Sequence, residues 1–106
     1  MTNILKSLED TILERREADP DKSYVASLRA KGRAKMAEKL GEEAIETVIA
    51  AVQGDQTAMT GEAADLLFHL MVLLADMDLS LDDVIAELAR REGLSGLDEK
   101  AARGTS

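Results

Sequence analysis

The sequence predicts an all-α protein of four to five helices, arranged as an antiparallel helical bundle that homodimerisation completes. Apolar side chains recur at helical spacing, and glycine, proline and capping residues interrupt them. Apolar residues make up 45% of the chain but only Tyr24 and Phe68 are aromatic, and such an aliphatic mixture favours helix over sheet. A chain of 106 residues buries a limited fraction of its surface when it folds alone, which favours oligomerisation.

The first part of the chain predicts two short helices separated by a turn. The first helix ends before Pro20, because proline disfavours helix in the residue that precedes it. Ser23 can cap a second helix, which Gly32 interrupts. The apolar residues that define the two helices are Ile4, Leu5, Leu8, Ile12 and Leu13 in the first, and Tyr24, Val25 and Leu28 in the second.

Two longer helices are expected next, from about residue 33 to 52 and from about residue 57 to 77. Gly54 and Asp55 end the first of them. Its buried side is expected to consist of Met36, Leu40, Ile45, Val48, Ile49 and Val52. The second includes LLFHLMVLLA, which is apolar on every side apart from His69, so we expect this helix to be buried all round at the centre of a homodimer.

Ser80 and Asp83 form a capping signature for a last helix, which is expected from Leu81 to about Glu92 and to end at Gly93. From about residue 98 the small polar tail is expected to fray. No internal repeat or composition shift divides the chain, so residues 1–106 are expected to form a single domain.

Composition excludes several classes of function. The chain has no cysteine, which excludes disulfides, thiolate zinc sites and cysteine nucleophiles. A net charge of −8 argues against binding to nucleic acid, whose phosphates need a basic surface. The N-terminus lacks the pattern of a secretory signal, and the most apolar stretch, residues 63–75, is too short to span a bilayer. We therefore expect a soluble cytoplasmic protein that does not bind membranes.

Each long helix carries a pair of acids three residues apart, Glu43 with Glu46 and Glu62 with Asp65. Three residues is close to one helical turn, so both acids of a pair share a face. If the helices pack antiparallel across the short loop between them, all four carboxylates converge. Mg²⁺ suits such an all-oxygen site, which keeps positions open for water and substrate phosphates.

The alternative is a solvated acidic face on a non-catalytic helical dimerisation module. The apolar contexts of Glu46 and Asp65 argue against it, because a carboxylate sunk in such a segment costs several kcal/mol unless a positive charge compensates it. His69, one turn after Asp65, has three possible roles: metal ligand, a group that orients Asp65, or a satisfied core histidine. The last is favoured.

The motifs EEAIE at residues 42–46 and EAAD at residues 62–65 resemble the EExxE…ExxD signature of the all-α nucleoside-triphosphate pyrophosphohydrolases. The segments ERREADPDKSYVASLRAKG, EKLGEEAIE, EAADLLFHLMVLL and GLSGLDEKAAR together resemble the phosphoribosyl-ATP pyrophosphohydrolase family over nearly the whole chain. This resemblance implies Mg²⁺-dependent hydrolysis of phosphoribosyl-ATP to phosphoribosyl-AMP and pyrophosphate, the second step of histidine biosynthesis. The nearest alternative is a MazG-like or dUTPase-like pyrophosphohydrolase, which would keep the metal site and change the pocket for base and sugar.

For that chemistry, the expected metal ligands are Glu43, Glu46, Glu62 and Asp65. The base that accepts the proton of the attacking water is expected among Glu42, Glu43 and Glu46. Substrate phosphates beyond the metal need cations, and the candidates are Lys39, Lys35, Arg33 and Lys100. Lys39 is preferred because it lies one turn before Glu43.

Overall fold

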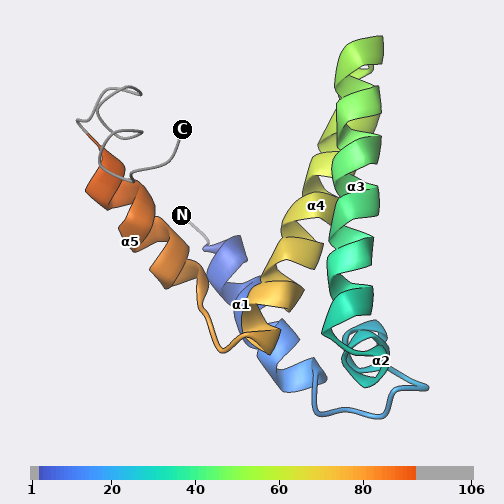
Figure 1. Ribbon diagram of the computed structural model, residues 1–106, viewed down its shortest axis with the longest axis vertical. Helices are drawn as coiled ribbons and strands as arrows, with labels where there is room; N and C mark the ends of the chain where they lie inside the picture. Colours follow the sequence, from blue (N-terminus) through green and yellow to red (C-terminus); the bar gives the residue numbers. More distant parts are fainter. Residues whose placement is uncertain (1–2, 93–106) are drawn as a thin grey trace.

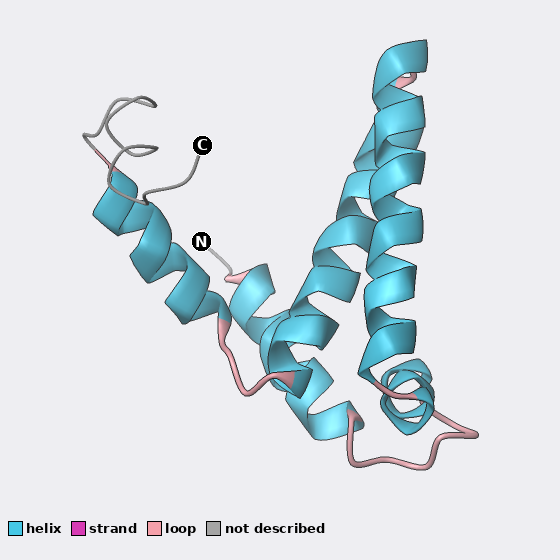
Figure 2. Cartoon of the chain, viewed as in Figure 1, coloured by secondary structure: helices cyan, strands magenta, loops and turns pink. Residues whose placement is uncertain are grey.

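The computed structural model describes residues 3–92, and within that range the chain forms five α-helices and no strand (Figures 1 and 2). The all-α class is therefore confirmed. The predicted ends of the helices fall within one or two residues of those observed, except that α1 already ends at Arg15, before the turn that precedes Pro20. The helices are α1 (Ile4–Arg15), α2 (Tyr24–Lys31), α3 (Arg33–Gln53), α4 (Gln56–Asp76) and α5 (Leu81–Arg91).

Helices α3 and α4 form a long antiparallel hairpin, the upright arm in Figure 1. Gly54 ends α3 in the left-handed conformation at φ +70°, which glycine adopts without steric cost. Asp55 then caps α4, because its Oδ1 accepts the Ala58 amide at 3.0 Å. Two residues thus suffice to reverse the chain, a tighter connection than the loop expected between residues 52 and 57.

Helices α1 and α2 pack against the end of the hairpin that lies away from its turn (Figure 1). Ser23 caps α2 by accepting the Ala26 amide, and Gly32 separates α2 from α3 at φ +98°. Both predictions are confirmed. The buried apolar core lies where these helices meet α4, and it consists of Ile12, Val25, Leu28, Met36, Met71, Val72 and Ala75.

Polar contacts fix the lower end of α4 to the rest of the molecule. Arg16 Nη1 donates to the Ala75 carbonyl at 3.0 Å. Arg33 Nε pairs with the Asp76 carboxylate at 2.7 Å. These arginines come from α3 and from the end of α1, so α4 is bound from two directions just where it stops.

Helix α5 leans away from the hairpin (Figure 1). Ser80 and Asp83 form the predicted capping box at its start. The buried Glu9 of α1 also accepts the Leu81 amide, at 2.6 Å between Oε2 and N. None of the residues of α5 is buried, although its apolar side chains share one face. The expected stop at Gly93 and the tail lie outside the described residues.

In the single chain, the expected buried side of α3 is covered only in the first part of the helix. Met36 is buried and Leu40 half-buried, whereas Ile45, Val48, Ile49 and Val52 are 49–82% exposed. Beyond Leu40, the side of α3 that faces α4 carries small or acidic residues, such as the buried Ala50. The larger aliphatic side chains point outward and find no partner among residues 3–92.

Helix α4 is long and apolar enough to cross a membrane by length and composition alone. It is nevertheless the core helix of the fold, because its second half carries the buried residues His69, Met71, Val72 and Ala75. Burial all round is not observed within the single chain, since Leu67 is 44% exposed.

The turn of the hairpin gives a matched pair of glycine substitutions. Gly54→Ala should destabilise the protein by about 1 kcal/mol, because an L-residue is strained at positive φ. Gly41→Ala, inside α3 with no atom within 4 Å of the added Cβ, should stabilise it by up to about 1 kcal/mol. Urea unfolding followed by circular dichroism measures both, and equal signs would contradict the assigned turn.

Candidate metal centre

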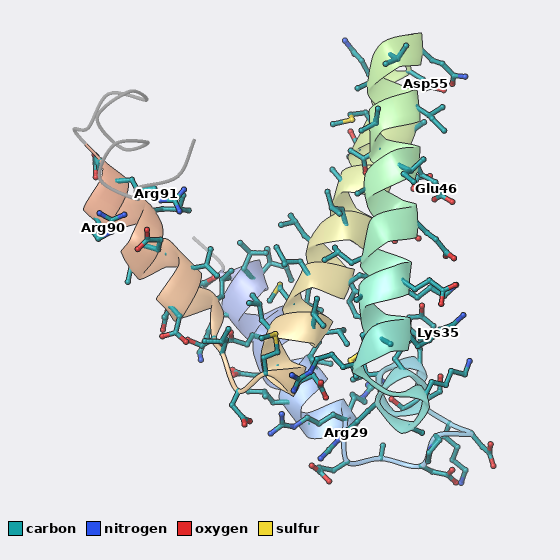
Figure 3. All side chains as sticks on the ribbon, in the orientation of Figure 1. Arg29, Lys35, Glu46, Asp55, Arg90 and Arg91 are labelled. Carbon is teal, nitrogen blue, oxygen red and sulfur yellow. The ribbon has the colours of Figure 1, made fainter. Side chains whose placement is uncertain are left out.

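The antiparallel packing of α3 on α4 brings acids from both helices together. One carboxylate oxygen from each of Glu43, Glu62 and Asp65 lies within 4.8 Å of the others. Glu46 lies outside this group but beside Glu62, close enough to raise its pKa. Figure 3 shows Glu46 midway along α3, between Lys35 and Asp55. All four acids named from the sequence therefore gather on one stretch of the hairpin.

The enclosed acids are Glu43 and Glu62, whereas the sequence context predicts that Glu46 and Asp65 are the enclosed ones. Both are half-buried, and each has a buried Oε2 atom without a hydrogen-bond partner. Asp65 and Glu46 are exposed, so the expectation that they are sunk among apolar side chains is wrong. The apolar residues next to them in sequence point to other faces of their helices.

Crowding of negative charge raises the pKa of two of these groups. The pKa of Glu62 rises to about 7, first because of the Glu46 carboxylate and then because of burial and Glu43. The pKa of Glu43 is raised chiefly by burial, with the nearby carboxylates of Glu46 and Asp65 adding to the effect. Like charges held this close disfavour one another's ionised form.

A hard divalent cation fits this arrangement. The donors are all carboxylate oxygens from two facing helices, and two of them are buried without partners. An unpartnered buried carboxylate oxygen is costly, and a cation bound between the helices would remove both that cost and the mutual repulsion. The cluster can therefore hold a metal ion, and oxygen donors of this kind suit Mg²⁺, Ca²⁺ or Mn²⁺.

The proposed phosphate-binding residues are engaged with other acids. Lys39 Nζ pairs with Glu42 Oε2 at 3.3 Å, and Lys35 with Glu38 at 3.2 Å. Arg33 binds Asp76 at the base of the hairpin, 43 residues away in sequence. Lys39 and Glu42 form an exposed pair on the helix that carries Glu43 and Glu46, whereas Lys100 lies outside the described residues.

His69 is a satisfied core histidine. Its Nδ1 lies 2.8 Å from the Asp65 carbonyl oxygen, and its Nε2 lies 2.9 Å from the Tyr24 hydroxyl. A carbonyl oxygen only accepts, so Nδ1 carries the proton, and for a neutral ring Nε2 accepts the Tyr24 O–H. Both nitrogens are then engaged within the protein, and neither is free for a metal.

Sequence reasoning missed a hollow beside the acids. It has a volume of about 190 Å³ and opens between the two helices toward the hairpin turn. Its lining residues are Glu46, Ile49, Ala50, Gln53, Ala58 and Glu62. The small residues Ala50 and Ala58 are the sequence signal that could have indicated it, because they leave space where facing helices would otherwise fill it.

Comparison with known proteins gives a consistent result. The family model described as phosphoribosyl-ATP pyrophosphohydrolase matches residues 5–92. A phosphoribosyl-ATP pyrophosphatase of Rhizorhabdus wittichii is 67% identical over 103 residues, which are 97% of each chain. That of Erythrobacter litoralis is 67% identical over 96% of this chain and 98% of its own. That of Novosphingobium aromaticivorans is 63% identical over 94% of each.

The raised pKa of Glu62 predicts how the metal-free protein responds to pH. The Glu62 carboxyl contributes its full stabilisation of the folded state below the unfolded-state pKa of about 4.5. This contribution is lost as pH rises through the folded-state pKa of about 7. In EDTA, Tm should therefore fall between pH 5 and pH 8, and Mg²⁺ should restore more of it at pH 8 than at pH 5.

Thermal unfolding of Glu62→Gln tests this assignment. The variant should show a shallower fall of Tm with pH in EDTA, and Glu14→Gln, an exposed change on α1, should keep the slope of the wild type. The same slope in all three proteins would show that Glu62 does not cause the effect.

Proposed function

The chain belongs to the phosphoribosyl-ATP pyrophosphohydrolase family, and we propose that its carboxylate cluster is the site where this hydrolysis takes place. The reaction converts phosphoribosyl-ATP to phosphoribosyl-AMP and pyrophosphate, and it belongs to histidine biosynthesis. Membership of this enzyme family argues against the alternative of a non-catalytic helical dimerisation module. As a biosynthetic enzyme whose apolar helix is a core helix, the protein is soluble, and we propose that it acts in the cytoplasm.

The observation that carries the proposal is the pair of buried, unpartnered carboxylate oxygens on Glu43 and Glu62. A protein that needed these acids only for solubility would leave them in water. We propose that Mg²⁺ occupies the space between them, with Glu43, Glu46, Glu62 and Asp65 as the residues that hold it. When bound, Mg²⁺ supplies positive charge for the triphosphate and for the leaving pyrophosphate.

Glu46 is the best-placed proton acceptor. It is exposed, lies beside Glu62 and lines the hollow of about 190 Å³, so a water molecule in that hollow can reach its carboxylate. Glu43 is enclosed, and Glu42 is paired with Lys39. Glu46 then takes the proton as the water attacks one phosphorus of the α–β anhydride and pyrophosphate departs.

Lys39 is the proposed contact for a substrate phosphate beyond the metal. Its ammonium lies on the helix that carries Glu43 and Glu46, and the neighbouring Glu42 raises its pKa, which keeps it charged. Lys35 lies one turn earlier and is the second choice. Arg33 is less suited, because it is held at the base of the hairpin by Asp76.

Pyrophosphate release from phosphoribosyl-ATP in the presence of Mg²⁺ tests the proposal. Glu46→Gln, which keeps the shape but loses the charge, should lower kcat by about 100-fold or more, as removal of a general base does. Glu14→Gln is the matched control on α1 and should keep wild-type activity.

Control substrates separate the alternatives. Release from ATP or dUTP that matches release from phosphoribosyl-ATP would favour a broader pyrophosphohydrolase. Full activity of Glu46→Gln would exclude Glu46 as the proton acceptor and leave Glu43 or Glu42.

We also propose that a second copy of this chain covers the exposed apolar face of α3. This face consists of Ile45, Val48, Ile49 and Val52, at the spacing by which one helix packs on another. Exposed aliphatic side chains in such a contiguous set are costly in water. A two-fold axis across α3 would bury the face against itself, which suits a dimer of identical chains.

Val48→Glu tests this dimer, because it places a charge in the middle of the face at a position that is 60% exposed. Light scattering coupled to size-exclusion chromatography should show a dimer for the wild type and a monomer for the variant. Ala86→Glu adds the same charge on the exposed polar side of α5 and should remain dimeric. A monomeric wild type would overturn the proposal.

A further inference from the structure

The two aromatic residues of the chain meet in space although they lie far apart in sequence. Tyr24 of α2 and Phe68 of α4 have ring centroids 6.1 Å apart and planes inclined by 22°, which is a stacked arrangement. The imidazole of His69 meets both rings edge-on, at 5.8 Å from Tyr24 and 5.2 Å from Phe68. We call these three residues the aromatic cluster.

The aromatic cluster adjoins the carboxylates. His69 donates to the main-chain carbonyl of Asp65 at 2.8 Å, so the cluster lies one helical turn from a proposed metal ligand. Lys39 lies one helical turn before Glu43 on α3, toward the start of that helix. The aromatic cluster and Lys39 therefore both lie on the α2 side of the carboxylates.

Among residues 3–92, the structure shows aromatic stacking on only one face of the Tyr24 ring. Its hydroxyl is bound to His69 at 2.9 Å and one side of the ring stacks on Phe68, yet the residue is 49% exposed. With one side of the ring on Phe68 and the hydroxyl on His69, the ring face opposite Phe68 is the part of the side chain open to a ligand. A ring fixed by a hydrogen bond and by stacking loses little conformational freedom when a ligand packs on it.

We propose that the face of the Tyr24 ring opposite Phe68 stacks on the adenine of the nucleotide substrate, which makes Tyr24 a specificity-determining residue. This inference rests on the proposed function, and it names the part of the site that recognises the base. Planar bases stack on aromatic side chains, and Lys39, on the same side of the carboxylates, can face a phosphate of the same substrate. The site would thereby discriminate a nucleotide from a bare polyphosphate.

Kinetics of Tyr24 variants with phosphoribosyl-ATP test the stacking. Tyr24→Leu keeps apolar cover on Phe68 but removes the ring, and it should raise KM about 5- to 100-fold, the usual effect of losing one base–aromatic contact. kcat should change by less than about 3-fold, as expected when binding common to ground and transition states is lost. Tyr24→Phe restores the ring without the hydroxyl and should recover most of the affinity.

The outcomes separate this inference from the proposed function. A wild type that releases no pyrophosphate defeats the proposed function. An active wild type with an unchanged KM in folded Tyr24→Leu defeats the stacking alone. An equal loss in Tyr24→Phe and Tyr24→Leu would assign the effect to the hydrogen bond with His69 and also overturn it.

A second measurement needs no variant, because Tyr24 is the only tyrosine in the chain. Its ring protons give one set of NMR signals, and stacking of a purine should shift them upfield. AMP, added above the concentration at which it inhibits pyrophosphate release, should produce this shift, and ribose 5-phosphate, which lacks the base, should not. Unmoved signals with inhibitory AMP, or equal shifts with both compounds, would overturn the proposal.

Discussion

The antiparallel packing of α3 against α4 is the constraint on which the rest of the structure depends. It alone places acids from two helices in one cluster, and both helices must run past each other in register for Glu43 to meet Glu62. The other elements hold this hairpin at its open end. Arg16 binds the Ala75 carbonyl and Arg33 binds Asp76, so the last turn of α4 is tied to the end of α1 and to the start of α3.

The same packing creates an electrostatic conflict among the carboxylates that the described residues do not resolve. Enclosing Glu43 and Glu62 removes their solvation and sets them beside two further carboxylates, so both pKa values rise. The nearest cation along the helix, Lys39, pairs with Glu42 on the outer side instead. The carboxylates at the centre of the hairpin therefore repel one another, and a positively charged ligand would stabilise them.

Local features of the fold could be predicted from sequence, and features set by distant partners could not. Gly54 and Ser80 act through their own backbone neighbourhood, and both predictions are confirmed. The acid pairs could be named because a short connection forces antiparallel packing. Which face of α3 is buried depends on what packs there, so Val48, expected on the buried side, is exposed in the single chain. The meeting of Tyr24 with α4 depends on how α2 docks, which no local pattern encodes.

The tight turn at Gly54 and Asp55 also limits how chains of this kind can change in length. Within a helix, one added residue rotates everything beyond it by about 100° and advances it by about 1.5 Å. An insertion or deletion between Gln56 and Glu62 would therefore carry Glu62 and Asp65 away from Glu43. Length changes should be tolerated in the segment that joins α1 to α2 and around the ends of α5, where no acid of the cluster is displaced.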